Sequence, residues 1–369
     1  MYIKTLQLKD FRNYEQLSLE FSDGINILYG DNAQGKTNIL EALYLMATTK
    51  SHRGAIDKEV VRFGTNEAHI RGEVFRDGAT WRIDMHLQSR RSKGIAIDGQ
   101  RLKKASELVG KIPTVLFSPE DLAIVKDGPS QRRRFIDMEL CQLNESYLYN
   151  LARYNRVIQQ RNKLLKEIYE HPEQKPLLDV HDKQLVVYGK EIIRFRQIFL
   201  DQVREIIAPI HDKLTAGEER LTLTYEPHVA EDDLEAALAS ARDRDVILKQ
   251  TTVGPHKDDF AFYVARKGVP GGPVDIRHFG SQGQQRTASL SLKLAEIEIV
   301  KRSKKENPVL LLDDVLSELD KNRQKALLDE IGEIQTIITC TGYDEFVNSR
   351  LKIDRLLHVQ NGTVQVVEE

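Results

Sequence analysis

The segment 30–37 has the residue types and the spacing of a phosphate-binding loop, G-x-x-x-x-G-K-[ST]. It consists of Gly30, Asp31, Asn32, Ala33, Gln34, Gly35, Lys36 and Thr37. Glycine allows backbone N–H groups to close around phosphate oxygens, because no Cβ is in the way. Lys36 is expected to reach the β- and γ-phosphates of a nucleotide, and the Thr37 hydroxyl to bind Mg²⁺. The spacing therefore predicts a nucleotide site, with Lys36 as one of its catalytic residues.

Two acids at the end of an apolar run supply the second half of that chemistry. The run 309–312 is followed directly by Asp313 and Asp314. At the carboxyl end of a central strand, Asp313 is placed to hold Mg²⁺ directly or through water, and Asp314 to polarise the attacking water. Taken alone, such a string more often ends a strand in a solvated acidic turn. The phosphate loop upstream favours the catalytic interpretation.

A third candidate is a small, polar helix start late in the chain. Ser281, Gln282, Gly283 and Gln284 precede a long helical pattern, and a helix N-terminus with small residues can bind a phosphate. Because the chain already has a phosphate loop, this segment is best used across a dimer, on the γ-phosphate held by a second copy. An ordinary glycine-containing helix start explains the same residues equally well. The segment 317–320 fits a loop that crosses the same interface, or a plain N-cap.

The sequence pattern predicts a strand before the phosphate loop and a helix after it, as a phosphate-binding loop requires. The apolar run 25–29 indicates a strand, and apolar residues at helical spacing follow the loop. From about 130 to 244 the pattern is helical without a persistent heptad, which indicates a compact helical domain. Within it, a helix over 177–207 is expected to stop at Pro209. Strand-like alternation then returns, so the fold predicted is α/β.

Three parts follow from this change of pattern along the chain. Residues 1–128 are expected to form an N-terminal lobe with the phosphate loop, and residues 129–250 a helical arm domain. Residues 251–369 are expected to form a C-terminal lobe with the polar helix start and the two acids. The two ends of the chain would then make one head, with the helical domain inserted between them.

Composition excludes several classes of protein. The 369 residues carry a net charge of −2, with 40% hydrophobic and 30% charged residues, so a nucleic-acid site must be a local patch on a globular protein. Cys141 and Cys340 are far apart and imply neither a disulfide framework nor a zinc site, which fits a reducing cytosol. We see no signal peptide and no run near the ~20 apolar residues of a membrane span. The expected location is cytoplasmic.

Clusters of cationic residues are the candidates for DNA contacts. They are Lys50, Arg53, Arg90, Arg91, Lys93, Arg132 and Arg133. Such side chains bind phosphates through charge and counterion release, without reading bases. Solvated surface is the more common explanation for each cluster alone. His256, Asp258 and Asp259 are close in sequence, but we expect a structural role there, because no further metal ligands are spaced nearby.

The order of these motifs resembles that of the ABC-type ATPases. The phosphate loop, a signature-like segment at 281–285, the two acids and the segment 317–320 follow one another as in that superfamily. Two features depart from it. The chain has Thr339-Cys340-Thr341 where a histidine often follows the last strand, so a hydroxyl is expected to replace the imidazole. It also has Ser118 and its neighbours where a glutamine is usual.

A closer resemblance covers nearly the whole chain, to the RecF family of bacterial recombination mediators, relatives of SMC proteins. The strings that carry it include FRNY at 11–14, SHR at 51–53, FSPEDL at 117–122, RRRFID at 132–137, GPHKDD at 254–259 and GSQGQQRT at 280–287. The resemblance implies an ABC-type ATPase head of two lobes with an inserted helical arm, and it adds Arg12 and Asn13 to the nucleotide site.

The resemblance to RecF implies that the protein binds DNA in an ATP-dependent manner. It implies an ATP-dependent homodimer at gapped or junction DNA, with weak, DNA-stimulated ATP hydrolysis that resets it. The implied partners are RecR directly, and RecO and RecA indirectly, in the loading of RecA.

Two other functions remain open. The first is a structural chromosome ATPase of the SMC type. At ~1.5 Å rise per residue, the helical insert is too short for the very long arms of that role. The second is the energy-coupling subunit of a transporter, which the helical insert and the SQGQQ string argue against.

Overall fold

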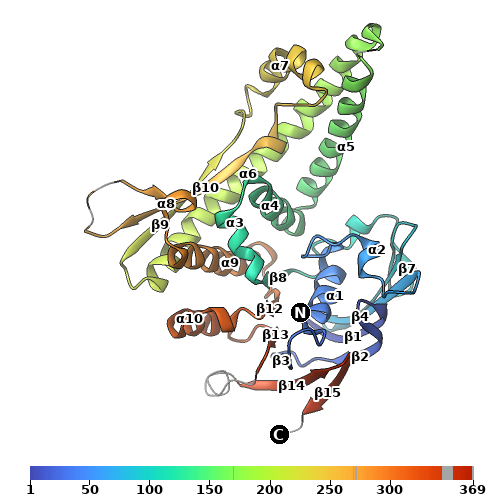
Figure 1. Cartoon of the computed structure of the whole chain (residues 1–369), viewed down its shortest axis with the longest axis vertical. Helices are drawn as coiled ribbons and strands as arrows, with labels where there is room; N and C mark the ends of the chain where they lie inside the picture. The colour runs from blue at the N-terminus through green and yellow to red at the C-terminus, as the bar shows by residue number, and fades with distance from the viewer. Residues whose placement is uncertain (169, 269, 271, 343–351, 368–369) are drawn as a thin grey trace. The chain divides into compact units, whose positions relative to one another are not determined.

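The computed structural model describes residues 1–168, 170–268, 270, 272–342 and 352–367 (Figure 1). The chain folds into two compact units, one of Met1–Asp121 with Glu296–Glu369 and one of Leu122–Ala295. Residues 251–295 thus belong to the same unit as the helices before them, so residue 250 is not a boundary between compact units. The division into three functional domains stays a prediction. No helix among the described residues is long and apolar enough to span a membrane.

A mainly parallel sheet forms the centre of the first unit. Its strand order is β15-β14-β3-β13-β12-β8. The strands are β3 (Ile25–Tyr29), β8 (Thr114–Phe117), β12 (Val309–Asp313), β13 (Thr336–Cys340), β14 (Ile353–Gln360) and β15 (Thr363–Val367). All pairs are parallel except β14 with β15, which form an antiparallel hairpin. Every residue of β8 and β12 is buried, which explains why both read as continuous apolar runs.

An antiparallel sheet forms the other layer of the first unit, in the order β2-β1-β4-β5-β6-β7. Its strands are β1 (Tyr2–Phe11), β2 (Tyr14–Glu20), β4 (Glu67–Arg76), β5 (Ala79–Gln88), β6 (Gly94–Ile97) and β7 (Gln100–Arg101). Helix α1 (Lys36–Thr48) contacts β8, β12 and β13 of the parallel sheet and β4 of this one. Because both of its sides are covered, α1 is apolar nearly all round.

Short helices complete the first unit. They are α2 (Asp57–Val60), α10 (Lys321–Ile331) and the 3₁₀ turns η1 (Ala105–Glu107), η2 (Pro119–Asp121) and η5 (Leu316–Glu318). The Asp320 side chain accepts hydrogen bonds from the N–H groups of Asn322 and Arg323 and so caps α10. The N-cap explanation for the segment 317–320 is therefore correct for Asp320, whatever else the segment does.

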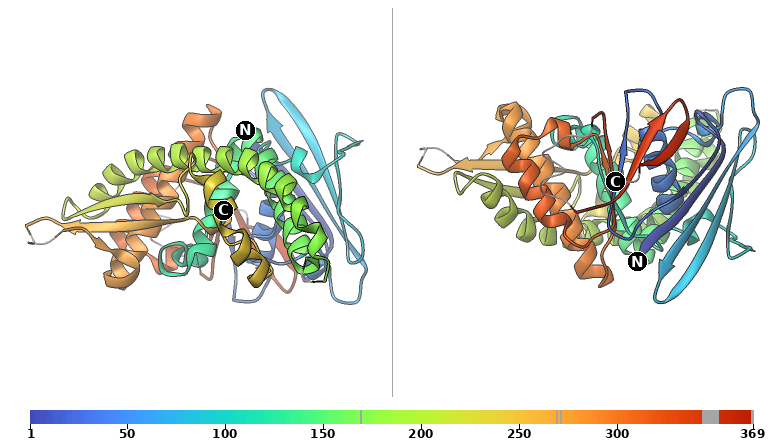
Figure 2. Two further views of the ribbon diagram at one scale, coloured as in Figure 1. Left: turned by 90° about the horizontal axis from the view of Figure 1, so that it is seen from above. Right: turned by 90° about the horizontal axis from the view of Figure 1, so that it is seen from below.

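The second unit is mostly helical. Its helices are α3 (Leu122–Lys126), α4 (Pro129–Leu143), α5 (Glu145–Glu167), η3 (Pro172–Leu177), α6 (Leu178–Leu214), α7 (Leu234–Leu248), η4 (Pro255–Lys257) and α8 (Ile276–Phe279). Helix α9 (Gln282–Lys304) begins here and ends in the first unit. A small sheet has the order β11-β10-β9, from β9 (Glu219–Glu226), β10 (Asp259–Arg266) and β11 (Val274–Asp275). Helices α5, α6 and α7 lie side by side (Figures 1 and 2).

The predicted stop of a helix at Pro209 is wrong. Helix α6 runs through this proline and ends at Leu214. A proline inside a helix removes one backbone hydrogen bond and strains the preceding turn. Ile206, Ile207 and His211 are nevertheless buried on either side of it. Burial of this face therefore outweighs the local penalty, which the sequence pattern alone does not reveal.

Candidate nucleotide-binding site

The segment 30–37 forms the turn between β3 and α1, and its two glycines are needed where they stand. Gly30 and Gly35 have φ of 151° and 112°, values that favour glycine. A Cβ on Gly30 would lie 2.2 Å from the Val359 carbonyl oxygen. A Cβ on Gly35 would lie 2.6 Å from both the Asn13 amide nitrogen and the Tyr14 hydroxyl. The predicted strand, glycine loop and helix are thus present, and their close packing explains the glycine spacing.

The side chain of Lys36 curls back over this loop. Its ammonium group donates hydrogen bonds to the carbonyl oxygens of Gly30 at 2.6 Å and Asp31 at 2.7 Å. The residue is only 7% exposed. The positive charge is therefore held inside the turn, at the N-terminus of α1, where the helix dipole also favours an anion.

The Thr37 hydroxyl and the first of the two acids meet at the carboxyl end of the parallel sheet. Thr37 Oγ1 donates to Asp313 Oδ1 at 2.8 Å, although 276 residues separate them in sequence. The same carboxylate oxygen accepts from Thr339 Oγ1 at 2.8 Å. The Thr339 hydroxyl in turn accepts from the Asp314 N–H at 3.0 Å. A hydroxyl near the end of β13 therefore contacts the acid pair, close to the place where an imidazole is common in the superfamily.

Asp314 differs from its neighbour in backbone and environment. Its φ is 52°, in the left-handed region that non-glycine residues seldom adopt. It is partly exposed, and one of its carboxylate oxygens accepts from Ser317 Oγ at 3.1 Å. The turn thus directs the two carboxylates to different partners. Backbone strain of this kind concentrates at functional sites.

Arg12 forms an ion pair, unrecognised in the sequence, with Glu41, whose side chain is fully buried, while that of Arg12 is partly exposed. Arg12 donates to both carboxylate oxygens of Glu41 in α1, at 2.7 and 2.8 Å, and to the Glu59 carbonyl oxygen at 2.7 Å. Ser51 Oγ adds a hydrogen bond to Glu41 at 2.5 Å. Burial raises the pKa of Glu41, but the hydrogen bonds and charge of Arg12 outweigh it, so the pKa lies below its usual value. An acid inside an otherwise apolar helix was the available sequence signal.

This pairing bears on the expected role of Arg12. Its three guanidinium nitrogens already have acceptors, so contact of Arg12 with a nucleotide stays a prediction. Asn13 lies closer to the loop, since its amide donates to the Gln34 carbonyl oxygen at 3.3 Å. Gln34 Oε1 also accepts from the Asn361 N–H at 2.6 Å. Turns from both sheets therefore hold the loop.

The Tyr14 side chain is buried against Gly35. Its hydroxyl has no hydrogen-bond partner among the described residues, and burial raises its pKa. A buried hydroxyl without a partner is unusual, and it faces the loop that would hold phosphates.

The residues of the loop fit a nucleotide with Mg²⁺. Backbone N–H groups at a helix N-terminus and one lysine suit phosphate oxygens. The hydroxyl of Thr37 and the carboxylate of Asp313 are oxygen ligands of the type that Mg²⁺ prefers. Because they lie within hydrogen-bond distance of each other, one ion could contact both.

The signature-like segment lies in the second unit, at the start of α9. Ser281, Gln282 and Gly283 are exposed there. Ser281 Oγ accepts from the Gln284 N–H at 3.2 Å, and Gln284 Oε1 accepts from the Ser281 N–H at 2.9 Å. This reciprocal pair is a capping box. The helix start is therefore ordered, and its use on a second copy's nucleotide stays a prediction.

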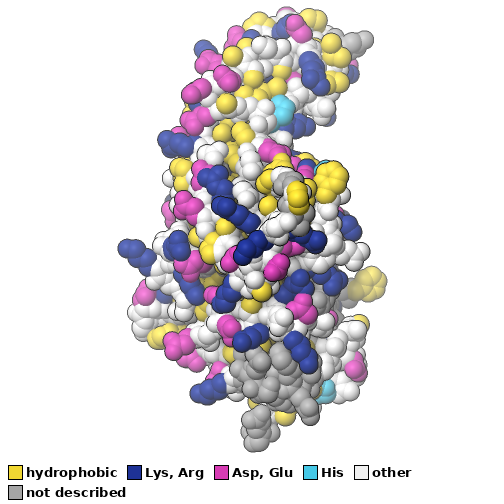
Figure 3. All heavy atoms as spheres, turned by 90° about the vertical axis from the view of Figure 1, so that its left-hand side faces the viewer, with side chains coloured by type: hydrophobic (Ala, Val, Ile, Leu, Met, Phe, Trp, Pro, Cys, Tyr) yellow, Lys and Arg dark blue, Asp and Glu magenta, His cyan; other side chains and the backbone are white. Residues whose placement is uncertain are grey.

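Five of the candidate DNA contacts lie in the first unit. Lys50, Arg53, Arg90 and Arg91 are exposed. Lys93 is instead tied down, because its ammonium group bonds the Thr49 carbonyl oxygen at 2.6 Å and Asp57 at 2.7 Å. This contact places residues 90–93 beside residues 49–50, and so joins two clusters that are separate in sequence. Figure 3 shows basic and acidic side chains interspersed over the described part of the viewed face.

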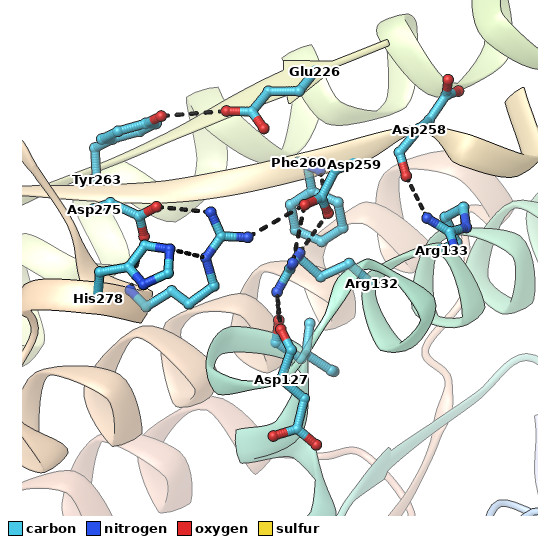
Figure 4. A network of polar contacts seen from close by, with 12 residues as sticks. Asp127, Arg132, Arg133, Glu226, Asp258, Asp259, Phe260, Tyr263, Asp275 and His278 are labelled. Carbon is cyan, nitrogen blue, oxygen red and sulfur yellow. Dashed lines mark hydrogen bonds and ion pairs between the residues drawn. The ribbon is translucent and has the colours of Figure 1, made fainter. Parts of the chain in front are cut away.

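The other two candidates, Arg132 and Arg133, are in the second unit, and for Arg132 the prediction is wrong. Arg132 is 1% exposed and bonds Asp259 at 2.6 and 3.0 Å and the Asp127 carbonyl oxygen at 2.6 Å (Figure 4). Its charge therefore serves the fold. Arg133 is partly exposed and donates to the Asp258 carbonyl oxygen at 2.7 Å. Burial and the nearby Arg196 lower the pKa of Arg133.

The residues 256–259 have the structural role expected of them. Asp258 accepts from Arg196 Nη1 at 2.9 Å and from the His228 N–H at 2.9 Å. His256 lies 2.8 Å from the Tyr154 hydroxyl, and burial lowers its pKa to about 4. These side chains form hydrogen bonds with other residues of the protein, as is expected of buried polar groups.

One other group among the described residues has metal-ligand chemistry. Glu67, His69 and His86 on β4 and β5 offer ligand atoms within 4.8 Å of one another. The hollow beside the two histidines is also lined by four cationic residues, Lys9, Arg71, Arg91 and Arg101, against one acid, Asp84. Positive charge on this scale opposes a cation, and we assign no metal to the group.

Comparisons with known proteins agree on one family. The model of the RecF/RecN/SMC N terminal domain matches residues 2–365. The DNA replication and repair protein RecF of Lachnoclostridium phytofermentans is 55% identical, over 99% of both chains. RecF of Agathobacter rectalis is 54% identical over 100% of both.

Solved structures agree with this. A structure of the recombination mediator protein RecF with ATP, in the RecFOR pathway, has a TM-score of 0.91 at 35% identity, and covers 100% of this chain and 98% of that one. An Smc head bound to the winged-helix domain of ScpA has a TM-score of 0.60 at 16% identity, which shows a shared fold alone. The α/β fold of an SMC-like, ABC-type ATPase head with inserted helices is therefore confirmed, and the chain belongs to the RecF family of DNA replication and repair proteins.

Proposed function

We propose that this protein is an ATP-gated DNA clamp of recombinational repair and replication. Two copies bind ATP with Mg²⁺, each at its own phosphate loop. Ser281 and Gly283 of each copy contact the γ-phosphate held by the other, so closure of the dimer depends on ATP. Slow hydrolysis then opens it.

The observation that carries the proposal is the contact of Thr37 with Asp313 beside the inward-curled Lys36. Two segments that are far apart in the sequence meet here, and each supplies the group that its role requires. A relative at 35% identity was solved with ATP, which supports ATP as the nucleotide.

Each side chain of the site has a separate task. Lys36 exchanges its two carbonyl partners for phosphate oxygens, and Thr37 with Asp313 holds Mg²⁺. The ion would neutralise phosphate charge when bound. Asp314 orients and polarises the attacking water, while the Thr339 hydroxyl fixes the Asp313 carboxylate and the Asp314 N–H in place.

DNA is bound by the exposed cations of the first unit, Lys50, Arg53, Arg90 and Arg91. They lie on neighbouring segments because Lys93 bonds the Thr49 carbonyl oxygen. Contacts of this kind go to the phosphate backbone and do not depend on base sequence. We also propose RecR as a direct partner, and RecO and RecA as indirect ones; the solved relatives are named as members of the RecFOR pathway.

Binding of a labelled DNA duplex tests the proposal when it is measured with and without ATP. ATP with Mg²⁺ should tighten binding by the wild type. Lys36→Ala should abolish this increase and weaken ATP binding by about tenfold or more, since hydrogen bonds to a charged group are lost. Lys321→Ala, an exposed lysine on α10, is the control and should behave as the wild type. If the wild type binds DNA with equal affinity with and without ATP, the proposal that ATP controls the clamp is refuted.

A further inference from the structure

The capping box at the start of α9 depends on the orientation of one side-chain amide. Gln284 uses its Oε1 to accept from the Ser281 N–H at 2.9 Å. Ser281 Oγ accepts from the Gln284 N–H, so the hydroxyl proton of Ser281 can still be donated to another group. The two ends of an amide differ in chemistry, and a flipped amide would present N–H to N–H here.

Glu219 sets that orientation. Its Oε1 accepts from Gln284 Nε2 at 2.7 Å, the end of the amide that faces away from Ser281. The Glu219 side chain is 12% exposed, so water competes little for this bond. A carboxylate can only accept, and it therefore holds the amide with its oxygen toward the Ser281 N–H.

Glu219 also contacts the end of the longest helix in the chain. It is the first residue of β9, shortly after α6 ends at Leu214. Its other oxygen lies 3.6 Å from Nε2 of His211, which is buried in the last turn of α6. His211 Nδ1 is 2.9 Å from Ser291 Oγ, which is on α9. One carboxylate thus touches both the end of α6 and the first turn of α9.

We propose that Glu219 is a positioning residue for the signature segment, which ties the geometry of Ser281 to the end of α6. It acts through Gln284 and does not touch nucleotide itself. The proposal rests on the proposed function, because Ser281 matters only if it contacts a phosphate on a second copy. Its structural part is independent of that function, because the bonds exist in a single chain without nucleotide.

Hydrogen–deuterium exchange without nucleotide tests the structural part. In Glu219→Ala, the peptide that covers residues 279–286 should exchange about fivefold faster, the effect of weakening one hydrogen bond. Glu219→Gln keeps an oxygen that can accept from Gln284 and should stay near the wild type. Glu218→Ala, the exposed neighbour, is the matched control and should not differ from the wild type. Unchanged exchange in Glu219→Ala would overturn the proposal.

A double-mutant comparison separates positioning from general stability. If Glu219 acts through Gln284, the Glu219→Ala change should speed exchange of residues 279–286 in the wild-type background. It should have no further effect in a protein that already carries Gln284→Ala. An equal effect in both backgrounds would mean that Glu219 supports the fold through Arg266 or His211, and would overturn the proposal. Global unfolding by urea, measured in parallel, shows whether each variant is folded.

ATP-dependent dimerisation in the Asp314→Asn background tests the functional part. Glu219→Ala should weaken the dimer about fivefold or more, and Glu219→Gln should restore it. A dimer of unchanged affinity in Glu219→Ala would overturn the link to function. If the Asp314→Asn protein itself does not dimerise, the proposed function fails, and the exchange experiment still decides whether Glu219 positions Ser281.

Discussion

Replacing Arg132 with alanine should destabilise the protein strongly and leave the salt dependence of DNA binding unchanged. The guanidinium donates to both oxygens of Asp259 and to the carbonyl oxygens of Ile124 and Asp127 (Figure 4). Removing one partner of a buried pair costs ~3–5 kcal/mol of the free energy of unfolding, because the other charge is left buried. Arg277 Nη1 stays 3.3 Å from Asp259, which favours the lower end of that range.

Urea unfolding of the protein measures this loss. With a slope of ~1–3 kcal/mol per molar urea, a loss of about 3 kcal/mol moves the midpoint down by roughly 1–3 M. Arg156→Ala, an exposed arginine on α5, is the matched control and should shift the midpoint far less. The same two variants are then compared in DNA binding between low and moderate salt.

Two results together would refute the structural role of Arg132. One is a midpoint within a few tenths of a molar of the wild type. The other is a log–log salt slope reduced by about 0.9, the value for one lost phosphate contact. That outcome would mean that Arg132 contacts DNA.

Three further perturbations address the phosphate loop and the basic patch. Arg12→Ala should lower the free energy of unfolding by ~3 kcal/mol at pH 7. Because the pKa of Glu41 is depressed in the wild type, its stabilisation is present above about pH 4.5 and is lost below it, so the deficit of the variant in urea unfolding should shrink on acidification. The double change Arg90→Ala and Arg91→Ala should reduce the salt slope of DNA binding by about 2, which anisotropy titrations measure. Gly35→Ala should cost ~1–3 kcal/mol in stability and abolish ATP binding in calorimetry, because φ is 112° and a Cβ would clash.

Functional motifs whose residues are close together in the sequence were predictable. The phosphate loop and the acid pair each fit within a few residues. Thr37 and Asp313 were each expected to bind Mg²⁺, and the structure places their oxygens 2.8 Å apart. The hairpin of β14 with β15 was visible from its turn residues, Asn361 and Gly362.

Partners far apart in sequence were not predictable in this way. Arg132 looks like surface charge until Asp259, 127 residues away, is placed beside it. The same holds for Arg12 with Glu41, and for the Gln284 bond to Glu219. Pro209 shows the related failure, in which burial of a helix face overrides a local stop signal.

The mass of the Asp314→Asn variant in solution tests the central claim most directly. Asparagine keeps the shape of the side chain but cannot polarise water, so ATP should stay bound and the two heads should stay closed. With ATP, Mg²⁺ and duplex DNA, light scattering should find a protein component of twice 42.3 kDa, and without ATP one of 42.3 kDa. A protein that remains at 42.3 kDa with all three ligands present would contradict the ATP-gated clamp.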